Sequence, residues 1–493
     1  HMGQNGDIFF SWGKAMGGNY TGVFAYYLSS PFSFLVLLFP QEQITAALFV
    51  MNLLKIGCAG LTFAVFLRKR FGQWDSVYPV FAMAYALLSY NIVYSMCLMW
   101  LDGVIWLPVV FAGADDVLQG KRPWLLFFAL SVVFLSNYYT SYMVVLAAIL
   151  YFLMRYFAEE ARPLQDFLKK LGWCAGAVLG AAGVGAWLLV PTLCSLLQGK
   201  IGSAGNAQVQ MFNFELSQLP AKFLPGVYDS ITNSGLPSVF CGGMALFLVI
   251  CFFVHPGFSG RERLCSGAVL ALFVVSFWIG PLDVVWHVFQ VPNWFPYRYA
   301  FAFGFFMIYL AVRAFCSLRT LPVKRYTAAV LAWLIFCLGA YLLWNERRTE
   351  TVLAALLTGA VYVLLLLFLK QRKTKQTAVV VAVALAFCGA AEFFYNGSKL
   401  VVGLDQQFHY KTEASYTDFL AQVQPLVRTA EKDADGTFFR MEKDFERSKN
   451  DALGLGYNGI THYSSAYSRS VNSFLKSLGM SQAYFWDSYY GAT

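Results

Sequence analysis

Charged residues are scarce in this chain. Asp, Glu, Lys and Arg together make up 13% of its 493 residues, whereas a soluble globular domain averages about 25%. Hydrophobic residues account for 58%, and the mean hydropathy is +0.55. This balance excludes an ordinary soluble domain and predicts a membrane protein. The net charge of +9 is typical of basic loops beside lipid headgroups, so we expect no nucleic-acid partner.

Motifs of several common chemistries are also missing. The sequence has no Walker A motif, no GxGxxG in a strand–helix context, no nucleophile elbow and no kinase signature. It has ten cysteines but no CxxC, and none falls in the last hundred residues, so no disulfide framework is indicated. The cysteines lie in or at the ends of apolar runs, where thiols act as small packing residues.

Long hydrophobic runs are abundant, and they predict a polytopic, mainly α-helical membrane protein. Twelve spans are visible, at residues 43–67, 76–96, 103–118, 123–136, 138–156, 171–197, 238–254, 264–281, 297–315, 326–344, 351–370 and 377–394. A helix needs about 20 residues to cross the hydrocarbon core. The third and fourth spans are shorter than this, so we expect them to be tilted, kinked or partly re-entrant.

The connections between spans alternate in charge. Every second connection is rich in Lys and Arg, as at 68–70 after the first span and 370–375 after the eleventh. The connections between them carry Asp, Asn, Trp and Tyr instead. Because basic connections stay in the cytoplasm, the second set is expected outside the cell.

This orientation divides the chain into three parts. Residues 1–40 are an extracytoplasmic first loop, in which SPFSFLVLLFP (30–40) is typical of an interfacial or re-entrant segment. Residues 41–395 are the transmembrane helical domain, with a long extracytoplasmic loop at 198–237. Residues 396–493 are an extracytoplasmic α+β domain. An exterior start needs an earlier helix to carry it there, so we expect the chain to be truncated at its N-terminus and also at its C-terminus.

Periodicity predicts the elements of the C-terminal domain. Residues 417–434 have helical apolar spacing that Pro425 interrupts, and 466–479 is a helix that Gly479 stops. Residues 437–445 alternate like a strand.

Two ionisable residues at the exterior ends of spans are the main functional candidates, because charges in a membrane bundle are costly. Asp102, in MWLDGVIWLP (99–108), is the candidate catalytic base or metal ligand; the alternative is a helix N-cap ahead of Gly103. Arg298, in NWFPYRYAF (293–301), lies where the chain re-enters the membrane, and Arg binds phosphate bidentately. The alternative is a snorkelling residue in an aromatic belt.

Neighbouring segments supply further polar groups. The tight exterior turn in LSNYYTSYM (135–143) either binds sugar hydroxyls or anchors the interface. In GGNYTGVFAYYLSSPF (17–32), a flexible turn lets backbone amides approach a phosphate or sugar closely. Besides Arg298, the candidate donor-binding residues are Asn19, Asn137, Tyr138, Tyr139 and Tyr297.

Other acids have plainer interpretations. Asp283 and His287 are four residues apart, as metal ligands on a helix are, but two ligands are too few for a zinc site, and we interpret them as polar interface residues. Glu392 is either structural or lines a pocket. No metal site is predicted from these residues. The acids interpreted as solvated loop residues are Asp115, Asp116, Glu215 and Asp229.

Five stretches together resemble the bacterial YfhO family of multispan membrane proteins. They are GGNYTGVFAYYLSSPF (17–32), SYNIVYSMCLMWLDGVIWLP (89–108), LSNYYTSYM (135–143), NWFPYRYAFAF (293–303) and FFRMEKDFERSKNDALGLGYNGITHYSS (438–465). Their order and spacing are more specific than any single motif, and the resemblance covers most of the chain.

The resemblance implies a function. The family is placed among the GT-C membrane glycosyltransferases, which take sugar from a polyprenyl-phosphate carrier and transfer it on the exterior face of the bacterial plasma membrane. Members are linked to glycosylation of lipoteichoic acid or related envelope polymers. A divalent cation, Mg²⁺ or Mn²⁺, would offset the charge of the carrier phosphate. The family also carries an Asp in its first exterior loop; Asp7 is nearby but does not match that motif.

Two other functions stay open. A transporter or flippase of lipid-linked sugars often shows internal repeats and broken helices at mid-membrane, whereas this chain shows no repeat and has its polar residues at the exterior lip. A non-catalytic scaffold for envelope assembly would use the C-terminal domain as an interaction module. The leading prediction is a glycosyltransferase.

Overall fold

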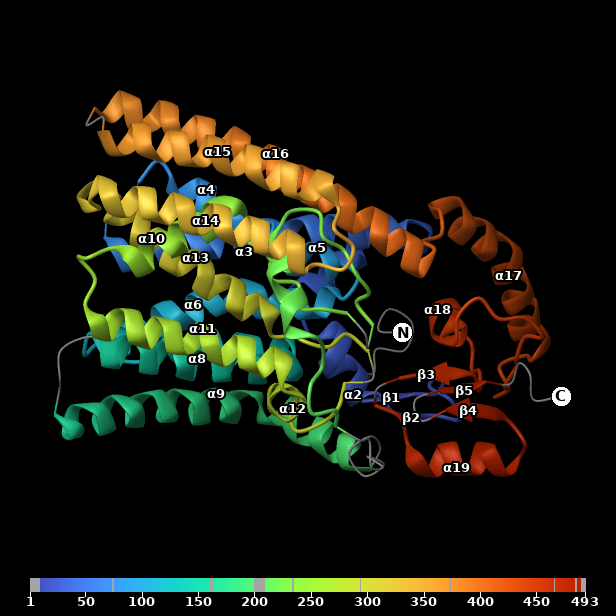
Figure 1. Cartoon of the computed structure of the whole chain (residues 1–493). Helices are drawn as coiled ribbons and strands as arrows, with labels where there is room; N and C mark the ends of the chain where they lie inside the picture. The colour runs from blue at the N-terminus through green and yellow to red at the C-terminus, as the bar shows by residue number, and fades with distance from the viewer. Residues whose placement is uncertain are drawn as a thin grey trace.

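The computed structural model describes residues 9–72, 75–158, 163–198, 209–232, 235–292, 294–371, 374–464, 466–483 and 486–488. Asp7, and residues 199–208 and 233–234 of the predicted exterior loop, lie outside these ranges. Most described residues form helices that run alongside one another, followed by a smaller C-terminal region (residues 409–488) of helices and short strands (Figure 1). The predicted mainly helical membrane fold is confirmed.

The helices of the bundle follow the predicted spans closely. In chain order they are α3 (Ile44–Phe71), α4 (Tyr78–Ala86), α5 (Ser89–Val93), α6 (Leu101–Leu118), α7 (Trp124–Ser136), α8 (Tyr138–Ala158), α9 (Leu164–Gln198), α10 (Gly243–Val254), α11 (Gly260–Trp278), α12 (Gly280–Trp286), α13 (Ala300–Cys316), α14 (Val323–Leu343), α15 (Thr349–Gln371) and α16 (Lys375–Phe408). Short turns connect some of them, namely η3 (Gln41–Gln43), η4 (Leu98–Trp100), η6 (Leu216–Phe223) and η7 (Leu318–Thr320).

The helices differ in whether they are long enough to cross a membrane. Within the described ranges, seven are long and apolar enough, at Gln41–Phe71, Leu98–Leu118, Tyr138–Ala158, Leu164–Gln198, Val323–Leu343, Thr349–Gln371 and Gln376–Asp433. Four apolar helices are shorter: Tyr78–Val93, Trp124–Ser136, Gly243–Val254 and Ala300–Cys316. The predicted total of twelve stays a prediction, because these four fall below about 20 residues and α11, which covers the predicted span 264–281, is in neither group.

Helix α6 lies inside the bundle and packs against α3, α7 and α8. Nearly all of its residues are buried, as expected of a helix that is apolar on every side. Gly113 allows α7 to approach closely, because a Cβ at this position would lie 2.5 Å from the backbone nitrogen of Leu126. With η4, the predicted short span becomes a 21-residue helix, Leu98–Leu118.

The basic connections meet at one end of the bundle. Asp115 accepts a hydrogen bond from Tyr151 at 2.9 Å and lies 3.4 Å from Arg155. Asp116 pairs with Lys69 and Lys121. Both acids are buried, so their interpretation as solvated loop residues was wrong. The N-terminal ends of α9 and α16, which follow basic connections, lie opposite the C-terminal region (Figure 1).

The N-terminal segment forms a hairpin and a bent pair of short helices. Strands β1 (Phe10–Ser11) and β2 (Gly18–Asn19) pair antiparallel, and α2 (Thr21–Val23) and η1 (Phe24–Leu28) follow. Next comes η2 (Pro31–Leu38), which is bent by 88° from the preceding helix. Its outer side chains are exposed and apolar. This geometry is that of a broken span or a re-entrant loop. The interfacial or re-entrant segment expected at 30–40 stays a prediction.

The C-terminal region contains α17 (Glu413–Asp433), α18 (Asp451–Leu455), α19 (Arg469–Ser477) and an antiparallel sheet of β3 (His462–Tyr463), β5 (Trp486–Ser488) and β4 (Ser481–Ala483), in that order. The predicted helices are confirmed, but Pro425 does not interrupt α17.

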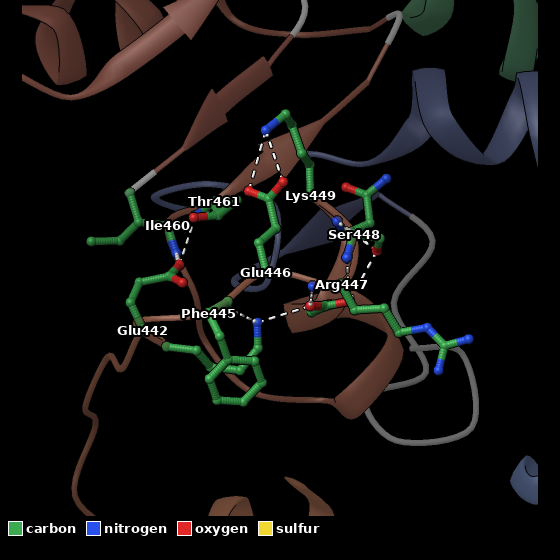
Figure 2. Close-up of polar contacts among 11 residues, drawn as sticks. Glu442, Phe445, Glu446, Arg447, Ser448, Lys449, Ile460 and Thr461 are labelled. Atoms are coloured by element: carbon green, nitrogen blue, oxygen red, sulfur yellow. Dashed lines mark hydrogen bonds and ion pairs between the residues drawn. The ribbon is translucent and has the colours of Figure 1, made fainter. Parts of the chain in front are cut away.

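The strand predicted at 437–445 was wrong. Its backbone makes isolated contacts in place of a ladder: the Met441 amide donates to the Asn458 carbonyl at 3.2 Å. The carboxylate of Glu442 accepts from the amides of Ile460 and Thr461, which ties this segment to the approach to β3 (Figure 2). The alternating sequence therefore reflects side-chain contacts of an extended segment without a partner strand.

The hairpin joins the C-terminal region to the bundle. The guanidinium of Arg440 donates to the carbonyls of Met16 at 2.7 Å and Ala15 at 3.1 Å. From the hairpin side, the buried Lys14 donates to the carbonyl of Ala466 at 2.6 Å. The C-terminal region is therefore attached next to the segments that carry the candidate site.

Candidate functional site

The predicted segments around 17–32, 99–108, 135–143 and 293–301 converge at one place. The indole of Trp100 donates to the hydroxyl of Tyr26 at 3.1 Å, and the Asn137 amide donates to the carbonyl of Tyr26 at 2.8 Å. The guanidinium of Arg298 lies over the Trp100 ring at 4.6 Å and over the Tyr139 ring at 5.1 Å. We call these five residues the Arg298 cluster.

Arg298 is a buried cation held by carbonyl oxygens and aromatic faces. Its Nε donates to the Phe295 carbonyl at 2.9 Å and its Nη2 to the Trp294 carbonyl at 2.6 Å; neither contact uses Nη1. The side chain is 9% exposed, so it does not snorkel along the lipid face. Among the described residues, no carboxylate lies within 4.0 Å of Arg298. A desolvated guanidinium without an acid partner attracts an anion.

The backbone that supports Arg298 is strained. Val288, Phe289, Phe295 and Tyr297 all have φ between 57° and 58°, in the left-handed region. Each such residue costs about 1–3 kcal/mol and persists only where its surroundings enforce it, often at functional sites. Two carbonyls of this segment, those of Trp294 and Phe295, accept hydrogen bonds from the guanidinium. The strained segment therefore holds the Arg298 side chain in place.

Tyr297 does not join the cluster. Its ring packs edge-on against Phe277 at 5.8 Å and Phe214 at 5.9 Å, within the apolar core. The ring therefore packs in the core and away from the guanidinium, which favours a packing role for Tyr297 over the predicted donor-binding role.

Asp102 forms a buried ion pair. Its Oδ2 lies 2.5 Å from the Lys55 ammonium, and its Oδ1 accepts from the Ser30 hydroxyl at 2.8 Å. Lys55 also donates to the Leu98 carbonyl at 2.9 Å. Both charged side chains are 1% exposed or less. The N-cap of α6 is Trp100, without a side-chain cap bond, so the N-cap interpretation of Asp102 was wrong.

This arrangement argues against Asp102 as a direct base. Both carboxylate oxygens are engaged, and the group is enclosed. The ion pair joins α3, α6 and the start of η2, which fixes the position of Trp100 beneath Arg298. These contacts favour a positioning role for Asp102, and its catalytic role stays a prediction.

The family model for bacterial membrane protein YfhO matches residues 1–492. The chain belongs to the YfhO family. It is 21% identical over 508 residues to the protein named "Uncharacterized protein YfhO" of Bacillus subtilis (strain 168). The match covers 95% of this chain and 54% of the relative, so the chain spans about half the length of that protein. No solved structure matches the chain.

Two predicted residues of this YfhO-family chain hold the backbone in place. The Asn137 side chain accepts from the backbone amides of Tyr139 at 3.1 Å and Thr140 at 2.8 Å, so it caps α8. Asn19 accepts from the Thr21 amide at 2.8 Å within the hairpin. These contacts engage both polar atoms of Asn137 and the side-chain oxygen of Asn19, so they favour a structural role for Asn137, and the donor-binding role of Asn19 stays a prediction. Tyr138 and Tyr139 pack against Tyr26, with ring centroids 5.8 and 6.1 Å away.

Asp283 and His287 lie beside the cluster. The His287 ring is 6.4 Å from Tyr139 and 5.8 Å from Tyr299, and its Nδ1 is 3.5 Å from Asp283 Oδ1. Burial raises the pKa of Asp283 to about 7, while Tyr299 and Arg298 act in the opposite direction. Their interpretation as polar interface residues understated this position: Asp283 is an acid that titrates near neutral pH next to the Arg298 cluster.

The donor set does not fit a resident divalent cation. In the part of the chain that the structure describes, no group of three or more His, Cys, Asp or Glu could hold a metal, and Asp102 is already paired with Lys55. The described residues therefore do not form a site for the Mg²⁺ or Mn²⁺ that the resemblance implies.

The remaining acids have structural partners. Glu392 accepts from the Gly243 amide at 3.0 Å and from the Tyr362 hydroxyl at 2.8 Å, so it caps α10 from within the bundle. Asp229 pairs with the buried Lys222 at 2.6 Å, so its interpretation as a solvated acid was wrong. Glu215 bonds Ser217 in an exposed turn.

Sequence reasoning missed Lys55 and Tyr26. Lys55 is the one charged residue inside an apolar run at 44–67, and an ionisable group there needs a partner of opposite charge. That signal would have called for an acidic partner, which the structure shows to be Asp102. Tyr26 hydrogen-bonds to both Trp100 and Asn137. It lies in an aromatic run in which nothing in the local sequence marks it out from the other tyrosines, so these contacts could not be predicted.

Proposed function

We propose that this YfhO-family chain is a membrane glycosyltransferase. It takes a sugar from a polyprenyl-phosphate carrier and transfers it to an envelope polymer, such as lipoteichoic acid, on the extracytoplasmic side of the bacterial plasma membrane. One observation carries the proposal: Arg298 is a buried guanidinium with no carboxylate partner among the described residues, held by two backbone carbonyls at one end of a membrane bundle. A lipid phosphate supplies the missing negative charge.

The proposed topology has twelve spans. Residues 1–40, the loop at 198–237 and an α+β domain at 396–493 lie outside the cell. The clustering of basic connections at the end opposite the C-terminal region supports this orientation (Figure 1). The side chains exposed on α9 and α16 include many apolar ones, such as Leu179 and Phe387, which suits contact with the lipid bilayer. The polyprenyl chain reaches the Arg298 cluster from that bilayer.

The proposed reaction uses Arg298 and Asp283. The acceptor hydroxyl forms a bond to the anomeric carbon while the bond from that carbon to the carrier phosphate oxygen breaks. The departing phosphate keeps the electron pair, and Arg298 stabilises its charge. The hydroxyl proton passes to Asp283, whose pKa of about 7 suits a base at neutral pH. The Lys55–Asp102 pair keeps Trp100, and through it Arg298, in position.

The test is transfer by purified protein in liposomes, with a polyprenyl-phosphate-linked sugar as donor and a short glycerol-phosphate polymer as acceptor. We expect sugar on the acceptor with the native chain and strongly reduced transfer with Arg298→Gln. Movement of the intact donor between leaflets without transfer would replace the proposal by a flippase. Neither transfer nor movement, in protein that still binds the donor, would indicate a scaffold.

A further inference from the structure

A groove lies at the basic end of the bundle, away from the Arg298 cluster. It has a volume of about 470 Å³ and runs between the first turn of α7 and residues 169–177 of α9. Its rim carries Arg122 and Lys169, and its walls carry Trp124 and Trp173. The two helices pack against each other further along.

Glycine spacing in α9 creates the groove. Gly172 and Gly176 are four residues apart and line it, and a Cβ added to either would have no atom within 4 Å. One turn later, a Cβ at Gly180 would lie 3.2 Å from Phe127, so the helices close together there. The result is a slot that is open at the basic end and closed by an aromatic ring toward the middle of the bundle.

The two cations at the rim differ from their neighbours. Lys121 pairs with Asp116 at 3.2 Å and Lys170 with Asp166 at 2.9 Å. Among the described residues, neither Arg122 nor Lys169 has a carboxylate within 4.0 Å. The positive charge at the rim is therefore available to a ligand.

We propose that this groove binds one anionic phospholipid. The phosphate lies between Arg122 and Lys169, and the glycerol and upper acyl chains lie along Gly172 and Gly176. The tryptophans fit this assignment, because indoles concentrate at the headgroup level of a bilayer. Basic pockets between membrane helices on the cytoplasmic side favour anionic headgroups. The lipid would fix α7 against α9 at the end opposite the site of transfer.

The experiment compares lipid binding by the purified native chain and three variants. Bound phosphatidylglycerol and phosphatidylcholine are counted by native mass spectrometry over a lipid titration. Each Lys or Arg near an anionic surface is worth about 5-fold in affinity, so Arg122→Gln with Lys169→Gln should weaken phosphatidylglycerol binding roughly 30-fold. The matched control, Lys324→Gln with Arg325→Gln, removes the same charge from the start of α14 and should leave binding unchanged.

A third variant separates shape from charge. Gly176→Leu keeps both cations and fills the groove, so it should also abolish the tight site. Equal binding by the native chain and both groove variants would overturn the proposal. So would phosphatidylcholine that binds as tightly as phosphatidylglycerol, or a lipid that inorganic phosphate displaces at equal concentration.

Discussion

Removal of either member of the Lys55–Asp102 pair should destabilise the protein strongly, whereas removal of both should not. The ammonium and carboxylate are 2.5 Å apart and are 1% and 0% exposed. A single change, Lys55→Met or Asp102→Leu, leaves one charge buried without a partner. Breaking a buried pair in this way costs about 3–5 kcal/mol, which is a large share of the 5–15 kcal/mol that typically holds a folded protein together.

The double variant tests the reasoning. Lys55→Met with Asp102→Leu replaces the pair by apolar groups of similar volume, which is often close to neutral. The Ser30 hydroxyl loses its acceptor, at a cost of about 1 kcal/mol, so the double variant should lie within about 2 kcal/mol of the native chain. The three variants and the native chain are compared by denaturant unfolding in the same detergent, followed by tryptophan fluorescence.

A second readout separates positioning from catalysis. Asp102→Asn keeps the shape of the carboxyl and removes its charge, so a positioning role predicts lower stability and a transfer rate that the double variant largely restores. If Asp102→Asn instead leaves stability unchanged and lowers transfer by about 10²-fold or more, and the double variant is equally inactive, then Asp102 is the base and the positioning assignment is refuted.

Three further outcomes are expected. In a cysteine-free background, an impermeant thiol reagent should label Ser468→Cys in intact cells and should not label Gln119→Cys; the reverse pattern would place the Arg298 cluster in the cytoplasm. Because burial raises the pKa of Asp283 to about 7 and a base must be ionised, the transfer rate should fall as the pH drops below about 7, and Asp283→Asn should be slow with no such pH dependence. Burial raises the pKa of Asp451, but the Lys443 ammonium and backbone amides outweigh it and hold that pKa below its ordinary value. The stability that this carboxylate contributes should be present above about pH 4 and be lost as the pH falls through the folded pKa. Hydrogen exchange of residues 445–451 measures it, and Asp451→Asn should lack it at neutral pH.

The helical layout was predictable because a membrane helix must satisfy its backbone internally and present apolar side chains, and both demands show in local sequence. Predicted spans such as 326–344 and 351–370 therefore lie within a few residues of α14 and α15. The prediction of a strand at 437–445 failed because alternation alone does not show whether a partner strand exists. Pro425 was misread because its missing amide is tolerated within α17.

The site was predictable only in part. The polar segments were recognised separately, and their convergence follows from tertiary packing that no local pattern encodes. Arg298 and Asp102 were found because charges are rare in apolar runs, yet the same rule applied to Lys55 would have shown that Asp102 is already paired. Asn137 resembled a sugar ligand because a capping amide and a binding amide have the same sequence appearance.

The central claim is that Arg298 holds a lipid phosphate, and the most direct measurement is the affinity of purified protein for a polyprenyl phosphate and for the polyprenol that lacks the phosphate. The native chain should bind the phosphate form more tightly. A charge-assisted contact contributes about 1.5–3 kcal/mol, so Arg298→Gln should lose about 10- to 150-fold in affinity for the phosphate form and little for the alcohol. Arg298→Lys should recover only part, because Lys lacks the planar fork. If the native chain binds the two lipids equally, or if folded Arg298→Gln keeps the preference for phosphate, the account is contradicted.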